Sequence, residues 1–178
     1  MRSVPSIALL LLSALCAGCA QGPREPVRSL LEIRREGVVV QEWDLSCGAA
    51  ALATVLTFAM GDPITERAVA QGMLRGTEPL KVKTRGGFSL LDMKRFTEAR
   101  GFQADGYQDL SLADLLEFSY PIVPVNVYGA DAHFVVVKGR TADGQILLGD
   151  PAFGNRRVTP AQFESMWQGG VGFVVSRS

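Results

Sequence analysis

The sequence predicts an α+β domain, with helices in its first half and an antiparallel sheet in its second. Residues 47–60 are almost purely small and apolar, and only Thr54 and Thr57 are polar after Gly48. A helix that is apolar nearly all round must be buried on most sides. After Pro121 the apolar residues come instead in short runs rich in β-branched side chains, which are typical of strands.

The length of the chain indicates the number of domains, and its charge excludes one class of partner. A chain of 178 residues suffices for one domain with a sizeable core and is short for two. Lysine plus arginine equals aspartate plus glutamate at 18 each, so there is no net positive charge to attract nucleic acid. Nucleic acid is therefore excluded as a partner, and we expect no cofactor and no metal.

The N-terminus predicts export. Residues 1–18 combine an arginine, an apolar run from Ile7 to Leu15 that is too short to span a bilayer as a stable helix, and small residues, as in a signal peptide. The end of this segment, Ala17-Gly18-Cys19, resembles the lipobox of bacterial lipoproteins. That resemblance implies a lipid on Cys19 and a periplasmic protein anchored to a membrane, with the outer membrane favoured by Ala20. The alternative is an ordinary signal peptide followed by a coincidental cysteine.

The next segment, residues 19–36, is charged and contains Pro23 and Pro26, so it predicts a tether to a domain at 37–178. The alternative is that Leu30 to Ile33 already packs on the domain. Valines crowd residues 37–41, and their β-branched side chains predict a short strand there.

Start signals predict three helices after the apolar one. Thr65 is a typical N-cap, and Ser89 with Asp92 and Ser111 with Asp114 form capping-box patterns. The predicted helices cover residues 66–74, 90–100 and 112–118. Strands are expected at residues 121–128, 133–140, 144–150 and 171–176, with a further helix at 161–167.

One thiol and one imidazole could form a catalytic pair. If Cys16 leaves with the signal peptide and Cys19 carries lipid, Cys47 is the remaining thiol, without a disulfide partner. Its place at the start of the apolar helix would lower the pKa of the thiol and favour the nucleophilic thiolate. The chain has one histidine, His133, so a thiol nucleophile has no other imidazole as its base.

The hairpin after His133 supplies a carboxylate to orient that base. With a two-residue loop at Asp143-Gly144, Asp150 lies opposite Val137, and with a loop at 141–144 it lies opposite Val135. Both registers place Asp150 on the face of His133, and the second makes them diagonal neighbours. Gln41 could supply an amide donor for the oxyanion of a tetrahedral intermediate. Each residue alone also fits a structural role, but together they indicate a catalytic site.

Three segments together resemble the cysteine peptidase family that removes double-glycine leaders from bacteriocins, a branch of the papain-like fold: residues 41–50, HFVVVKG and GDPAFG. The resemblance implies a central Cys-bearing helix packed on an antiparallel sheet. It implies peptide hydrolysis through a thioester, in which Cys47 attacks and His133 transfers the proton. Asp150 would orient the imidazole, and Gln41 would line the oxyanion hole.

The sequence looks closer to stand-alone exported relatives of functional-amyloid secretion systems than to the members attached to export transporters, because residues 87–96 are similar to a helix of the stand-alone proteins. We expect this helix to pack rather than to form a substrate groove. The expected partners are a peptide or protein substrate, a membrane and components of a secretion system. Two alternatives remain: a catalytically silent lipoprotein that binds an exported chain, and an acyl transferase similar to phytochelatin synthases.

Overall fold

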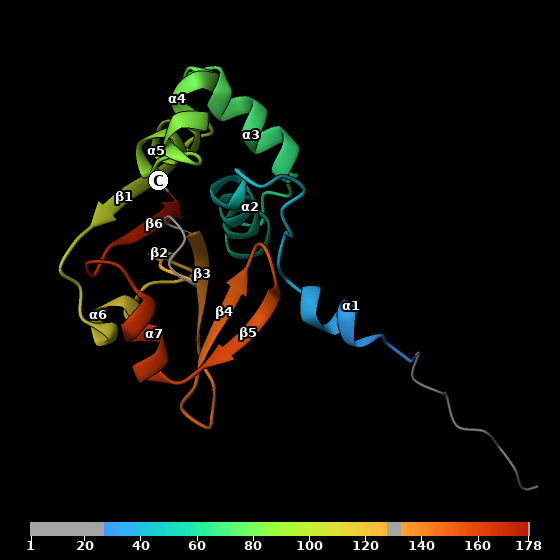
Figure 1. Cartoon of the computed structure of the whole chain (residues 1–178), viewed down its shortest axis with the longest axis vertical. Helices are drawn as coiled ribbons and strands as arrows, with labels where there is room; N and C mark the ends of the chain where they lie inside the picture. The colour runs from blue at the N-terminus through green and yellow to red at the C-terminus, as the bar shows by residue number, and fades with distance from the viewer. Residues whose placement is uncertain (1–26, 128–132, 178) are drawn as a thin grey trace, which may run out of the picture.

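A computed structural model describes residues 27–127 and 133–177, which form one antiparallel sheet with helices on both faces (Figure 1). The sheet order is β1-β6-β2-β3-β4-β5, where β1 is Phe102–Tyr107, β2 Ile122–Val125, β3 His133–Arg140, β4 Ile146–Asp150, β5 Gly154–Val158 and β6 Gly172–Arg177. The helices are α1 (Leu30–Arg35), α2 (Cys47–Thr54), the π-helical turn η1 (Val55–Ala59), α3 (Glu66–Leu74), α4 (Pro79–Arg85), α5 (Leu90–Ala99), α6 (Leu112–Glu117) and α7 (Pro160–Met166). The predicted α+β class is confirmed. The predicted signal peptide and Cys19 lie outside the described residues.

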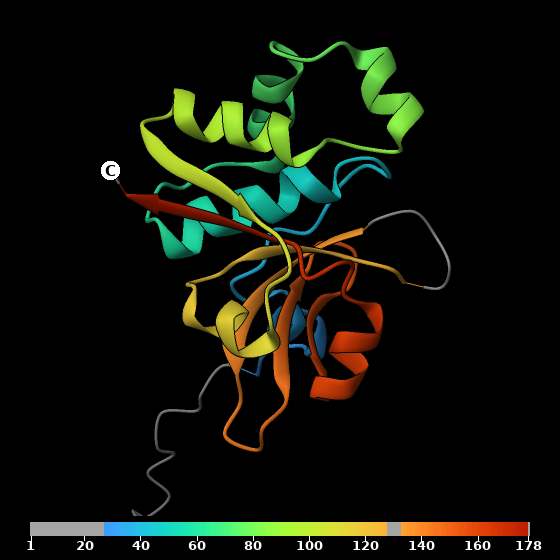
Figure 2. The same cartoon turned by 90° about the vertical axis from the view of Figure 1, so that its left-hand side faces the viewer.

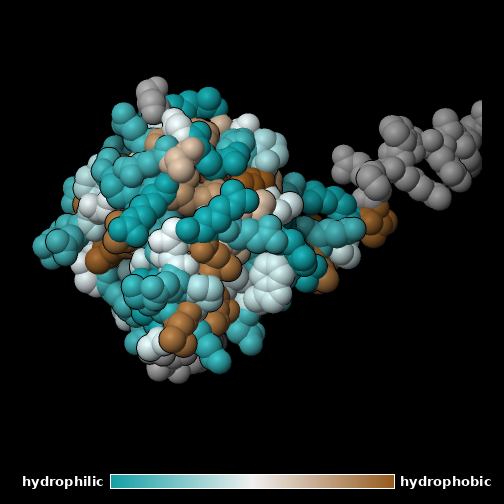
Figure 3. All heavy atoms as spheres, turned by 90° about the horizontal axis from the view of Figure 1, so that it is seen from above, coloured by the Kyte–Doolittle hydropathy of each residue, from teal (hydrophilic) through white to brown (hydrophobic). Residues whose placement is uncertain are grey.

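The sheet carries a hydrophobic core on each face. On one face α2, η1 and α3 pack with α5 against side chains such as Phe134, Val136 and Phe173. On the other, Leu115 of α6 and Phe163 of α7 pack against alternate residues of β2, β3 and β4. Figure 2 shows α3, α4 and α5 gathered at one end of the molecule, beyond the sheet. Seen over that end, the surface is mainly hydrophilic, with hydrophobic side chains in separate patches (Figure 3).

Helix α2 is buried along its whole length, as its composition predicts, and it continues into η1. Its alanines let the helix approach the sheet closely. The one hydroxyl in α2 is satisfied, because Thr54 Oγ1 donates to the Ala50 carbonyl at 2.9 Å and accepts the Val39 N–H at 2.9 Å. Helix α2 is therefore held in a fixed position inside the first core.

The three capped helices begin where their signals predict. Thr65, Ser89 and Ser111 each accept a backbone N–H from the first turn of α3, α5 and α6. Helix α7 also has a capping box, between Thr159 and Gln162. The predicted C-terminal helix and strands β2, β3, β4 and β6 are likewise confirmed.

The strand predicted at residues 37–41 is wrong. The Val38 N–H donates to the Arg35 carbonyl, the Val39 N–H to Thr54, and the Gln41 N–H to the Pro151 carbonyl at 2.8 Å. The segment is extended as its valines favour, but its donors are taken by turns and by a helix side chain. No neighbouring strand pairs with it among the described residues.

Neither predicted loop of the β3–β4 hairpin is correct. The pairs Arg140↔Ile146 and Val136↔Gly149 differ in register, because β3 has a bulge between Val137 and Gly139. The loop therefore comprises residues 141–145. The bulge returns the end of the hairpin to the second predicted register, in which extension of the ladder places Asp150 opposite Val135.

The described part of the expected tether contains α1, which contacts β5. Asn155 Nδ2 donates to the Glu36 carbonyl at 2.8 Å, and Lys138 Nζ donates to the same oxygen at 3.3 Å. This placement resembles the alternative in which Leu30 to Ile33 packs on the domain, although no residue of α1 is buried. Within the two described stretches, no helix has the length and apolar character needed to cross a membrane.

The packing of α3 on α5 gives a test of the fold. A Cβ added to Gly72 would overlap the Phe96 ring, whereas one added to Gly106 meets no atom within 4 Å. Alanine normally favours a helix over glycine, but here the overlap should dominate. We expect Gly72→Ala to lower the free energy of unfolding by about 1–3 kcal/mol in urea denaturation. Gly106→Ala, the matched control, should leave it within about 0.5 kcal/mol, and equal stability of both variants would contradict the packing.

Candidate active site

Cys47 is the first residue of α2 and is 7% exposed. The preceding Ser46 occupies the N-cap position but does not cap the helix, because its hydroxyl donates to the Trp43 carbonyl at 2.6 Å. The first N–H groups of α2 are thus left without a side-chain cap beside the thiol. They and the helix dipole favour negative charge at this point.

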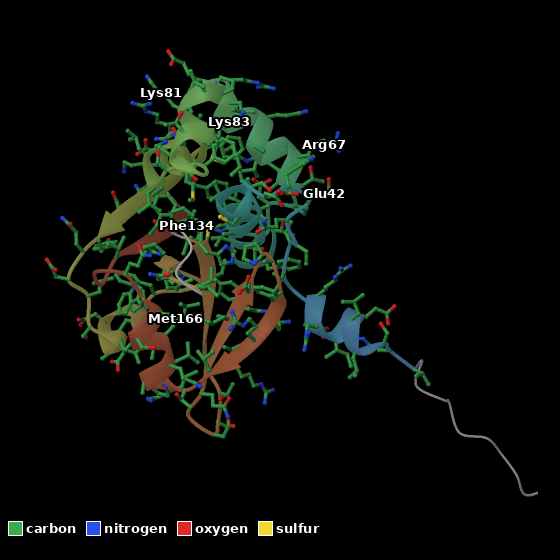
Figure 4. The ribbon with its side chains drawn as sticks, in the orientation of Figure 1. Glu42, Arg67, Lys81, Lys83, Phe134 and Met166 are labelled. Atoms are coloured by element: carbon green, nitrogen blue, oxygen red, sulfur yellow. The ribbon has the colours of Figure 1, made fainter. Side chains whose placement is uncertain are left out.

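Gly48 explains how α2 reaches β3. A Cβ at this position would lie 2.8 Å from Met93 Cε and 3.4 Å from Phe134 Cδ2. The missing side chain lets the start of β3 lie against the first turn of α2, where Phe134 is labelled in Figure 4. The backbone N–H of Phe134 and the imidazole of His133 lie beside the Cys47 thiol and favour its charged form.

His133 opens β3 and bonds to the carboxylate that closes β4. Its Nε2 donates to Asp150 Oδ1 at 2.8 Å, which leaves Nδ1 for the Cys47 thiol. The His133 side chain is 17% exposed and that of Asp150 is fully buried. The structure therefore brings together Cys47, His133 and Asp150, in that order.

Asp150 is held by donors on both carboxylate oxygens. Oδ1 also accepts the Ala152 N–H at 2.9 Å, in the turn that Pro151 begins. Oδ2 accepts from Arg156 Nη1 at 3.0 Å. Burial raises the pKa of Asp150. The hydrogen bonds and the charge of His133 lower this pKa by more than burial raises it, so the net shift is downward.

The pKa values favour a charged pair. For His133, burial lowers the pKa, but the hydrogen bond to Asp150 and the contact with Cys47 raise it to about 9. For Cys47, burial raises the pKa, but the hydrogen bonds from His133 and Phe134 outweigh burial and lower it. Both shifts act in the same direction, because each favours the thiolate–imidazolium form of the pair over a neutral thiol and a neutral imidazole.

Gln41 lies in the lead-in to α2, and its backbone N–H is bonded to the Asp150-Pro151 turn. Its Nε2 donates to the Trp43 carbonyl at 3.0 Å, and its buried Oε1 has no hydrogen-bond partner. No hydrogen bond joins its amide to Cys47 among the described residues, so its oxyanion role stays a prediction. One of its two amide hydrogens is left for such a role.

The lead-in is fixed by a buried carboxylate of α3. Glu66 is 3% exposed and accepts the Glu42 N–H on both of its oxygens, at 2.9 and 3.1 Å. The Glu42 side chain in turn meets Arg67 at 3.6 Å, as Figure 4 shows at the start of α3. The start of the segment between Gln41 and Cys47 is thus held to α3.

A hollow of about 180 Å³ opens beside the thiol. It is lined by Cys47, Phe134, Arg85 at the end of α4, and residues 86–89 of the loop between α4 and α5. Larger hollows lie elsewhere, such as one of about 440 Å³ between α3 and α5 that does not include Cys47. The expected packing role of the helix in residues 87–96 is consistent with the burial of Met93 in the core, but the loop before it borders the site.

Sequence reasoning missed Arg156, which contacts Asp150 from β5. The sequence carries no clear strand pattern at Arg156, because β5 has the polar sequence GNRRV and was not predicted as a strand. Within the described residues, no group of three or more His, Cys, Asp or Glu side chains is placed to hold a metal ion.

Comparisons with known proteins agree on one family. Residues 35–178 match the profile of the peptidase C39 family. A curated relative, the probable functional amyloid protease FapD of Pseudomonas aeruginosa, is 42% identical over 151 residues, and its counterpart from Pseudomonas fluorescens is 39% identical over 143. These alignments cover 85% and 80% of this chain, but the chain spans only 66% and 62% of the length of those relatives.

Solved structures share the fold. A double-glycine motif protease from an AMS/PCAT transporter, crystallised with a leader peptide, superposes with a TM-score of 0.63 at 24% identity, covering 79% of this chain and 91% of the other. The peptidase domain of Streptococcus ComA gives a TM-score of 0.63 at 23% identity, covering 79% and 98%. At these identities the likeness establishes the fold alone.

The charged pair predicts a pH profile for alkylation. Cys47 should react with iodoacetamide well below the ordinary pKa of a thiol, and the reaction should fall only as the thiolate is protonated in acid. Above about pH 9 the imidazolium loses its proton, and the pair is lost. In His133→Ala the thiol stays buried but loses the imidazolium that stabilises its negative charge. We therefore expect an alkylation rate at least tenfold lower at pH 7.

The measurement is the alkylation rate from pH 4 to 10 by mass spectrometry of the Cys47 peptide. Cys47→Ala reports the background from the other cysteines. A rate at pH 7 that is the same in the wild type and in His133→Ala would show that no pair forms.

Proposed function

The chain belongs to the peptidase C39 family, and on that premise we propose that it is a cysteine peptidase that cleaves an exported peptide or protein. The observation that carries the proposal is the contact of Cys47, His133 and Asp150, with the thiol at the start of a buried helix and open to a hollow. These residues have the types, the order and the pKa directions that acyl transfer to a thiol requires.

The geometry supports the following steps. The Cys47 thiolate attacks the substrate carbonyl carbon, and the uncapped N–H groups of α2, with the Gln41 amide, stabilise the oxyanion. The His133 imidazolium gives its proton to the leaving amine as the C–N bond breaks, which leaves a thioester on Cys47. Neutral His133 then accepts a proton from water, whose oxygen attacks the thioester, and the thiolate leaves. Asp150 holds the imidazole throughout.

The nature of the substrate is also a proposal. The two curated relatives carry the name of functional amyloid proteases, which supports an exported substrate connected with amyloid maturation or secretion. The name of the transporter protease refers to a double-glycine motif. We do not propose a double-glycine motif in the substrate of this chain, because its likeness to that protease is one of fold.

We further propose that the protein is a periplasmic lipoprotein, anchored through Cys19 and sorted to the outer membrane. This proposal is supported by the lipobox resemblance and by the apolar run before it. Components of a secretion system are the proposed partners. The anchor would keep the peptidase close to the path of exported chains.

Inactivation of the nucleophile tests the function directly. In cells that carry Cys47→Ala, we expect an exported protein to accumulate in an unprocessed, longer form, because thioester formation needs the thiolate. Quantitative proteomics of periplasmic and secreted fractions, with mapping of new N-termini, would detect it. Asp150→Ala should give the same unprocessed form. Unchanged processing in Cys47→Ala, with the variant present at normal levels, would favour the silent binding protein instead.

The anchor has an independent test. A fatty-acid analogue fed to the cells should label the wild-type chain and leave Cys19→Ser unlabelled, since the thioether and the new N-terminus both require Cys19. Cys16→Ser is the matched control and should remain labelled. Labelling of Cys19→Ser at the wild-type level would refute the lipoprotein proposal.

A further inference from the structure

We propose that Arg156 is a positioning residue of this site, which neutralises Asp150 and so limits how tightly His133 holds its proton. The proposal rests on the proposed function for its catalytic meaning. The geometry on which it stands is the bond from Arg156 Nη1 to Asp150 Oδ2 at 3.0 Å, on the carboxylate that also holds His133.

The sheet register places the two partners of Asp150 on opposite sides of it. Arg156 pairs with Leu148, two residues before Asp150, so both side chains lie on one face as diagonal neighbours. On the other side, His133 of β3 is the diagonal neighbour of Asp150. Arg157, the next residue, pairs with Leu147 and lies on the opposite face.

The Arg156 side chain is itself held in place. Its guanidinium carbon lies 5.5 Å from the centre of the Phe153 ring, and the side chain is 28% exposed. Asp150 is fully buried, so water screens the attraction between the two charges only partly. A cation–π contact and a charge-assisted hydrogen bond thus fix the guanidinium on Oδ2.

The charges of the site then balance in pairs. Cys47 and His133 form one pair, and Asp150 and Arg156 form the other. Without Arg156, the uncompensated charge of Asp150 would stabilise the imidazolium further, because Oδ1 would still be held by the Ala152 N–H and by His133. An imidazole that holds its proton too tightly is a poor acid for the leaving amine.

Two further cations line a hollow beside Arg156. Arg34 of α1 and Arg157 share with it a hollow of about 370 Å³ that includes Phe153 and Asn155. Neither has a hydrogen bond or ion pair with Asp150 among the described contacts. Arg157 is therefore a matched control, with the same charge and strand but the opposite face.

The single histidine makes the test specific. In the full chain labelled with ¹³C-histidine, His133 gives the one imidazole resonance, and its chemical shift against pH reports the protonation of that ring. We expect Arg156→Gln to move the midpoint upward by about half a pH unit or more. Arg157→Gln should leave it unchanged, and Arg156→Lys, which keeps the charge, should restore it towards the wild-type value.

Alkylation of Cys47 provides a second readout that does not require a substrate. In Arg156→Gln the step of the iodoacetamide profile at which the imidazolium loses its proton should move upward with the His133 midpoint. Arg156→Met keeps the aliphatic stem over Phe153 and serves if the glutamine variant is unfolded, as circular dichroism would show. An unchanged or lowered midpoint in the folded variant, or Arg156→Lys behaving like Arg156→Gln, would overturn the proposal. Neither readout depends on peptide cleavage. The proposal for Arg156 can therefore fail while the peptidase function stands, and the peptidase function can fail while the proposal for Arg156 stands.

Discussion

The bond between His133 and Asp150 is the constraint on which the rest of the site depends. It joins the first residue of β3 to the last residue of β4, so it exists only in one register of that hairpin. A slip by one residue would turn Asp150 to the opposite face of the sheet. The bulge between Val137 and Gly139 prevents this, because it absorbs the residue by which the loop is too long. Gly139, at a φ of 125°, takes a backbone conformation there that few other residues adopt.

A second constraint places the thiol against that bond. Helix α2 is packed on all sides in the first core, and its small side chains let it lie close to β3. Gly48 completes the approach, because no side chain separates the first turn of the helix from Phe134. The residues at the start of α2 therefore have separate tasks: the cysteine carries the thiol, and the glycine and alanines after it set its distance from the imidazole.

The sequence was sufficient for the parts whose signals are local. Capping residues such as Ser89 and Ser111 located helices, and the scarcity of histidine and free thiols singled out Cys47 and His133, which the structure brings together. The sequence did not reveal elements that form only because of the segments they pack or pair with. Strands β1 and β5 lie at the two edges of the sheet, where polar sequences such as FQADGY suffice because only one side is paired. The valines at 38–40 gave a strand pattern without a strand, since the N–H groups of Val38 and Val39 are bonded to the Arg35 carbonyl and to the Thr54 hydroxyl.

Arg156 escaped prediction for the same reason, and its place shows how the N-terminal segment bears on the site. Asn155, its neighbour on β5, binds the last carbonyl groups of α1, so the strand that braces Asp150 is itself braced by the N-terminal segment (Figure 1). The hollow beside Cys47 is bordered instead by the loop between α4 and α5. A substrate that enters this hollow therefore meets the helical side of the site, while α1 and β5 support the carboxylate from the other side. Such a division separates binding from positioning.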